Sequence, residues 1–204
     1  MTRRMLARLV MAGLLLGVSP GVLQAGPIPY PTAGVENPVL YTFTAAANGD
    51  VTAYFFAGAG AGFTNELTML VNGVPTGIQG LNNHTSAYGA SLVLGTVAAG
   101  DVLVFQMVNL IPGGIGPWYS DKSLNSDGIN HVYSTDFGGD AFIPAGTYVA
   151  FEDLPANWPP DFNYNDLAFV FTNVRTSVPE PGSLAMLGLG IVGAGVRRWR
   201  RRKA

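Results

Sequence analysis

The stretch DFNYND, which begins at Asp161, contains the side chains whose types and spacing most clearly suggest chemistry. Asp161, Asn163 and Asn165 alternate with two aromatic residues, so an extended backbone would point three oxygen-bearing side chains to one side. A calcium loop uses oxygen ligands at its first, third and fifth positions. The stretch is not an EF-hand, because Asp166 stands where that loop needs glycine and Thr172 stands where it needs a bidentate glutamate.

Further acidic residues precede this stretch in the sequence. Glu152 and Asp153 could join Asp166 after folding and complete a cage of oxygen atoms. The sequence therefore predicts a calcium site whose ligands come from Glu152, Asp153, Asp161, Asn163, Asn165 and Asp166. Asp and Asn side chains also cap turns by hydrogen bonding to nearby backbone, so a set of turn residues without a metal is the alternative interpretation.

The net charge of −2 hides a strongly acidic middle of the chain. Nine of the 11 Lys and Arg residues lie within the first eight or the last eight positions, which leaves Lys122 and Arg175. Twelve acidic residues remain beside them when Glu180 is set aside, so this part carries a net charge of about −10. Such a surface disfavours nucleic acid as a partner and favours divalent cations or basic partners, although solubility alone explains it equally well.

The residue types also exclude several kinds of active site. The chain has no cysteine, which rules out disulfides, zinc–thiolate sites and cysteine nucleophiles. It has no G-x-S-x-G motif, and neither His84 nor His131 has a partner at metal-binding spacing. We therefore expect a protein that is not an enzyme and whose two histidines are structural or exposed.

The elements that must position the acidic residues are β-strands. Short runs rich in β-branched and aromatic residues recur between turn residues, and none keeps a helical period long enough for a substantial helix. Alternation places Leu103, Phe105 and Met107 on one face of a strand. Asn72-Gly73 between two valines predicts a type I′ hairpin. We expect strands within residues 39–45, 50–58, 67–73, 91–97, 101–109, 130–136, 146–153 and 167–174.

These strands predict an all-β fold, a β-sandwich of antiparallel strands over residues 38–176. A lead-in at 26–37 precedes it, and we expect residues 27–34 of this lead-in to be mobile. Residues 1–25 place arginines, an apolar stretch and small residues in the order of a secretory signal peptide. Cleavage between Ala25 and Gly26 fits this pattern. We therefore expect export through the Sec translocon.

The last segment, residues 177–204, has three parts. Val178-Pro179-Glu180-Pro181 is kept extended by its two prolines. The 14 uncharged residues 183–196 predict a transmembrane helix, which is short at ~21 Å. The basic residues that would hold the following end on the cytoplasmic side are Arg197, Arg198, Arg200, Arg201, Arg202 and Lys203.

These three parts, in this order, resemble the PEP-CTERM sorting signal of Gram-negative bacteria. The resemblance implies that an exosortase-type membrane transpeptidase recognises Pro179-Glu180-Pro181 and removes the tail. It also implies an inner-membrane-anchored precursor whose processed form reaches the cell surface or the extracellular exopolysaccharide matrix.

A second resemblance concerns residues 125–174. FEDL followed by DFNYNDLAFVF resembles the DUF4114 type of domain, in which acidic and amide residues crowd a loop before the last strand. Together with the residues themselves, the two resemblances lead us to expect a non-enzymatic protein of the cell surface or biofilm matrix that binds calcium. The alternative is a carbohydrate-binding or carbohydrate-active module that acts on exopolysaccharide.

Overall fold

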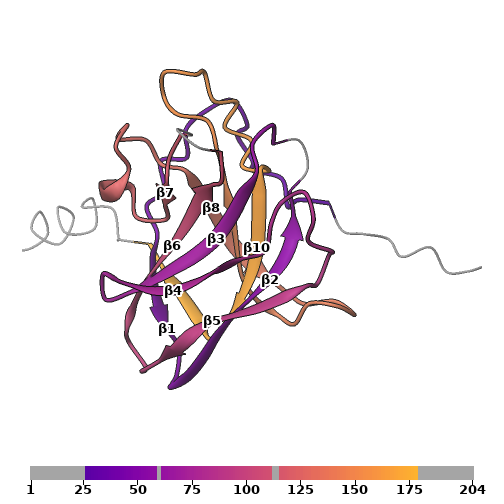
Figure 1. The fold of residues 1–204 in the computed structure, drawn as a ribbon, viewed down its shortest axis with the longest axis vertical. Helices are drawn as coiled ribbons and strands as arrows, with labels where there is room; N and C mark the ends of the chain where they lie inside the picture. Colours follow the sequence, from indigo (N-terminus) through magenta and orange to yellow (C-terminus); the bar gives the residue numbers. More distant parts are fainter. Residues whose placement is uncertain (1–25, 59–60, 112–114, 179–204) are drawn as a thin grey trace, which may run out of the picture.

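The computed structural model describes residues 26–58, 61–111 and 115–178 (Figure 1). The predicted signal peptide, the Pro-Glu-Pro motif, the transmembrane helix and the basic tail lie outside these residues. Within the described ranges the helical structure is a single 3-10 turn, η1 (Lys122–Leu124), and no helix there has the length and apolar character needed to cross a membrane.

The described strands form two antiparallel sheets that pack face to face (Figure 1). The first sheet has the order β11 (Val174–Ser177), β1 (Thr42–Ala45), β6 (Val102–Asn109), β3 (Asn65–Val71) and β4 (Val74–Gly80), and the short β7 (Trp118–Tyr119) also pairs with β6. The second sheet has the order β5 (Ser91–Val97), β2 (Gly49–Ala57), β10 (Leu167–Thr172), β9 (Gly146–Phe151) and β8 (Val132–Phe137). The predicted all-β fold of antiparallel strands in two layers is confirmed.

Every run in which we expected a strand overlaps one, and β5 coincides with its run at both ends. Strands β4, β7 and β11 are additional. β11 follows directly on β10 after Asn173 and reaches Ser177, which pairs with Thr42 in β1. The first sheet therefore extends to the start of the C-terminal segment.

The hairpin predicted at Asn72-Gly73 joins β3 to β4. Val71 pairs with Val74, so the connection has two residues. The φ angle is +50° at Asn72 and +81° at Gly73. A type I′ turn needs positive φ at both central positions, so the prediction is confirmed.

The main core lies between the two sheets. Leu103, Phe105 and Met107 of β6 point into it, as the alternation predicts, and each is at most 1% exposed. Phe105 stacks on Phe171 of β10 with ring centroids 3.8 Å apart and planes at 16°. This contact joins the two sheets directly, and burial of a side chain of this size stabilises the fold by about 1.5–3 kcal/mol.

A second core covers the opposite face of the second sheet. Tyr148 of β9 and Val170 of β10 point to this side and are fully buried. The segment 26–37 covers them: Tyr30 is 8% exposed, and the backbone N of Ile28 donates to Oη of Tyr148 at 3.1 Å. The expectation of a mobile lead-in is therefore wrong, because β9 and β10 present apolar side chains on both faces and both faces need cover.

Candidate cation site

Three carboxylates meet where β9 ends and β10 begins, in the loop drawn in orange at the top of Figure 1. Phe151 pairs with Leu167, so Glu152 and Asp153 leave β9 beside Asp166, which leads into β10. One oxygen atom of each carboxylate lies within 4.8 Å of the other two. Strand pairing thus brings together three of the predicted ligands.

All three carboxylates are buried, with exposed fractions of 1% for Glu152, 4% for Asp153 and 9% for Asp166. Oδ2 of Asp153 accepts a hydrogen bond from Nδ2 of Asn65 at 2.9 Å, and Oδ2 of Asp166 accepts one from the backbone N of Asp153 at 2.9 Å. Oε1 of Glu152 accepts a long hydrogen bond from Leu154, whereas Oε2 is buried without a partner. A buried polar atom without a partner is costly, so the cluster lacks donors or a cation.

The two basic side chains of the described residues lie elsewhere. Nζ of Lys122 is 2.7 Å from Oε1 of Glu36, and both side chains are about one-third exposed. Arg175 is exposed on the edge strand β11, opposite Thr44 of β1. Lys and Arg therefore do not neutralise the three buried carboxylates.

Burial raises the pKa of all three carboxyl groups. The pKa of Glu152 rises to about 8, first because of burial and then because of the charges of Asp166 and Asp161. The pKa of Asp166 rises to about 7 through burial and through the charge of Asp153, and burial also raises the pKa of Asp153. Without a cation the cluster holds protons near neutral pH, and a bound cation would displace them.

A cavity of about 190 Å³ adjoins the cluster. It is lined by Ala61, Gly62, Phe63, Glu152, Asp153, Leu154, Asp161 and Asp166. Asp161 is exposed, in contrast to the other three acidic residues, and therefore connects the buried cluster with solvent. The cavity thus gathers four of the six predicted ligands.

Asn163 and Asn165, the other two predicted ligands, line a different cavity of about 210 Å³ beside Pro27 and Tyr30. Phe162 has a φ of +47°, so the extended backbone expected for this stretch is wrong. The backbone N of Asn163 donates to Oδ1 of Asp161 at 3.1 Å, and the backbone N of Asn165 donates to Oδ1 of Asn163 at 2.9 Å. The stretch is therefore a series of Asx turns that sends its oxygen atoms to two sides.

Tyr164 anchors this loop to the rest of the fold. It is fully buried, although its φ is +53°. Its Oη accepts from the backbone N of Asn37 at 2.8 Å and donates to the backbone O of Asn130 at 3.0 Å. A non-glycine residue with positive φ needs such contacts to hold it, and here they fix the loop that carries Asp161 and Asp166.

Asn65 is a site residue that our sequence analysis missed. It is 1% exposed, donates to Asp153, and its backbone N donates to Oδ1 of Asn83 at 2.9 Å. The sequence does contain a signal for it. Asn65 is two and four residues from Leu67 and Met69, which face the core from β3, so its side chain lies on the same face of the strand. A polar side chain on the inward face of a strand requires a buried partner.

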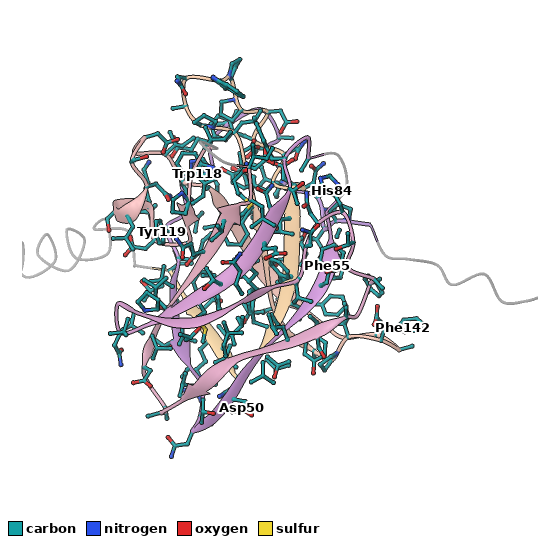
Figure 2. The ribbon with its side chains drawn as sticks, in the orientation of Figure 1. Asp50, Phe55, His84, Trp118, Tyr119 and Phe142 are labelled. Atoms are coloured by element: carbon teal, nitrogen blue, oxygen red, sulfur yellow. The ribbon has the colours of Figure 1, made fainter. Side chains whose placement is uncertain are left out.

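His131 contacts the backbone of the carboxylate cluster. It is fully buried between two acceptors, with Nδ1 at 2.7 Å from the backbone O of Glu152 and Nε2 at 3.0 Å from Oδ2 of Asp127. The indole of Trp118 stacks on its ring at 3.9 Å and donates from Nε1 to the backbone O of Asp153 at 2.8 Å. The expected structural role of His131 fits these contacts, and Figure 2 labels Trp118 at this upper end of the molecule.

A larger cavity of about 370 Å³ lies between β1, β6 and η1. Leu40, Tyr41 and Val102 contribute to its largely apolar wall, and it shares no residue with the carboxylate cavity. The carboxylate cavity is the smaller of the two, but it contains a buried atom without a partner, Oε2 of Glu152, and is therefore the better candidate for a ligand site.

The comparisons with known proteins concern the other end of the chain. The model of the PEP-CTERM protein-sorting motif matches residues 177–202. No curated protein and no solved structure matches the chain. The match begins at the last residue of β11 and covers the predicted Pro-Glu-Pro motif, the apolar run and most of the basic tail. The chain thus carries the signal of an exported protein whose membrane-anchored precursor is recognised by an exosortase in Gram-negative bacteria.

Proposed function

We propose that this protein is a non-enzymatic component of the cell surface or extracellular matrix and that its β-sandwich binds calcium through Glu152, Asp153, Asp161 and Asp166. The observation that carries the proposal is Oε2 of Glu152, which is buried without a partner and belongs to a group of three buried carboxylates. The resemblance of residues 125–174 to the DUF4114 type agrees with this assignment.

The donor set favours a cation that prefers oxygen ligands, such as calcium, over zinc. Calcium takes six to eight oxygen ligands at about 2.4 Å, so two oxygens on opposite sides of the ion lie about 4.8 Å apart. The three buried carboxylates offer oxygens within 4.8 Å of one another. Zinc prefers nitrogen and sulfur ligands, but the chain has no cysteine and both ring nitrogens of His131 have other partners. Calcium is also the cation that extracellular modules bind with dissociation constants of about 0.1–1 mM.

The contacts of the two histidines support a role without catalysis. In a Ser–His hydrolase the histidine lies next to the hydroxyl group that it activates. His131 instead binds Glu152 and Asp127, and Nε2 of His84 lies 3.0 Å from the backbone O of Phe63. Paired carboxylates as in glycosidases are another catalytic arrangement, and hydrolysis of chromogenic glycosides would contradict the proposal.

Thermal unfolding tests the calcium site directly. Residues 26–178 contain both hydrophobic cores, so this part is suited to measurement without the signal peptide and the sorting segment. We expect calcium at about 100 times its dissociation constant to stabilise the protein by ~2.7 kcal/mol relative to EGTA. The double variant Glu152→Gln, Asp166→Asn should lose this response.

The matched control is Asp136→Asn, which removes an exposed carboxylate from β8. It should keep the full calcium response, because it changes the net charge without touching the cluster. Equal melting temperatures in EGTA and calcium would contradict the site, and so would an undiminished shift in the double variant.

A further inference from the structure

An exposed aromatic pair stands beside the carboxylate cavity. The side chain of Trp158 is 51% exposed. Its ring centroid lies 6.1 Å from that of Phe63, with planes at 33°, and Phe63 lines the cavity. Two aromatic rings at the edge of an oxygen-lined cavity combine an apolar surface with a polar one.

Hydrogen bonds fix the backbone at both aromatic residues. The backbone N of Trp158 donates to Pro155 O at 2.9 Å, and the backbone N of Ala156 donates to Oδ2 of Asp127 at 3.1 Å. On the other side, the backbone O of Phe63 lies 2.9 Å from Nδ2 of Asn83 and 3.0 Å from Nε2 of His84, which Figure 2 labels at the upper right. A surface that is ordered before binding loses less entropy when a ligand arrives.

The cavity is larger than a metal ion needs. Its volume of about 190 Å³ is far above the ~10–15 Å³ that a single water molecule requires. A calcium ion would occupy only part of this volume, and its coordination shell has room for water or ligand oxygens besides the protein carboxylates. Phe63 and Asp161 line the same cavity as the three buried carboxylates, and Phe63 also belongs to the aromatic pair.

We propose that this surface binds a neutral sugar residue of a polysaccharide, with the sugar ring on Trp158 and Phe63 and two adjacent hydroxyl groups on calcium. A pyranose ring has an apolar C–H face and a rim of hydroxyl groups, which matches an aromatic surface beside a bound cation. A neutral sugar is favoured because Asp161 at the exposed part of the cavity repels acidic sugars. The inference rests on the calcium site proposed above.

Tryptophan fluorescence provides the test, because residues 26–178 contain only two tryptophans. Trp118 is 3% exposed and stacked on His131, so changes at the protein surface are reported by Trp158. The probes are D-mannose, D-galactose, L-fucose and N-acetyl-D-glucosamine, each titrated in calcium and in EGTA. We expect at least one of them to give a saturable change in calcium that disappears in EGTA.

Two variants separate the sugar site from the calcium site. Trp158→Ala should weaken sugar binding by about tenfold or more, measured by calorimetry, while the calcium-dependent rise in melting temperature remains. Asp166→Asn should lose both responses. Phe142→Ala is the control, since Phe142 is equally exposed (53%) on the loop between β8 and β9, away from Trp118 in Figure 2, and it should bind sugar normally.

Each result distinguishes the two proposals. A calcium-dependent melting temperature with no response to any of the four sugars overturns the sugar site and leaves the calcium site intact. Sugar binding that persists unchanged in EGTA overturns coordination by calcium. Absence of both responses overturns both proposals, and normal sugar binding by Trp158→Ala refutes the aromatic surface.

Discussion

Tyr30 packs edge-on against Tyr164, with ring centroids 4.9 Å apart and planes at 75°. Tyr30 belongs to the segment that precedes the sandwich, whereas Tyr164 anchors the loop of the candidate cation site. The contact therefore links the first described residues to the site, although 134 positions separate the two residues in the sequence.

We expect Tyr30→Ala to lower the free energy of unfolding by about 3 kcal/mol, because it removes a large buried side chain that the surrounding structure cannot replace. Urea denaturation of residues 26–178 measures this change. Tyr30→Phe should cost much less, since it keeps the ring, and Val93→Ala at a 46% exposed position should be nearly neutral. A cost below about 1 kcal/mol for Tyr30→Ala would show that the N-terminal segment does not stabilise the fold.

The acidic cluster predicts how stability depends on pH when calcium is absent. The pKa of Glu152 is raised from 4.5 to about 8 in the folded protein, so the folded state binds this proton more tightly than the unfolded state. The resulting stabilisation is complete below about pH 4.5 and is lost as the pH rises to about 8. Asp166 acts in the same direction between about pH 4 and 7.

We therefore expect the melting temperature in EGTA to fall between pH 5 and pH 8 and to fall less in Glu152→Gln, which cannot ionise. Circular dichroism at a series of pH values measures both slopes. Asp136→Asn should keep the slope of the original protein, because it leaves the three carboxylates of the cluster unchanged. If Glu152→Gln kept that slope as well, Glu152 would not be the titrating group.

Asn65 should stabilise the site mainly in the absence of a cation. In Asn65→Ala, Asp153 loses its side-chain donor while it stays buried, which costs about 1–3 kcal/mol. Calcium should recover part of this loss, because the ion neutralises the same carboxylate. Differential scanning calorimetry in EGTA and in calcium measures both effects. The control is Gln79→Ala, which removes an exposed amide–carboxylate hydrogen bond to Glu66 and should change stability little. If Asn65→Ala and Gln79→Ala lost the same stability, Asn65 would have no role at the site.

Gly146 marks a position where the second sheet cannot accept a side chain. A Cβ atom there would lie 2.4 Å from the backbone O of Phe171 and 3.0 Å from Cγ1 of Val170. Gly146→Ala should therefore separate the start of β9 from β10 and destabilise the protein by about 2 kcal/mol or more. Gly138→Ala is the control, because a Cβ atom at that position meets nothing within 4 Å. Chemical denaturation measures both, and equal stability of the two variants would refute the steric argument.

The sequence predicted those features that short-range chemistry determines. The alternation of side chains along β6 identified its inward face, and Asn72-Gly73 identified the hairpin. Both features depend on a few adjacent residues. The association of Glu152 and Asp153 with Asp166 also followed, since the two strands that they flank were recognisable.

Other features depend on contacts between distant residues and could not be predicted in this way. The docking of Tyr30 depends on an apolar outer face of the second sheet that becomes evident only when its strands are paired. The positive φ angles of Phe162 and Tyr164 are held by tertiary contacts, which include the hydrogen bonds of Tyr164 to Asn37 and Asn130, and local sequence preferences argue against them. They split the predicted ligands between two cavities.

The pairing of β11 with β1 has a mechanical consequence for a protein that is tethered through its C-terminal segment. Tension on the tether acts at Ser177, at the end of a four-residue edge strand that pairs with β1 from Thr42 to Ala45. A load applied across the strands would break these pairs one after another, starting with Ser177 and Thr42. β11 can thus detach from β1 under tension and lengthen the tether. The stacked rings of Phe105 and Phe171 meanwhile keep the two sheets together.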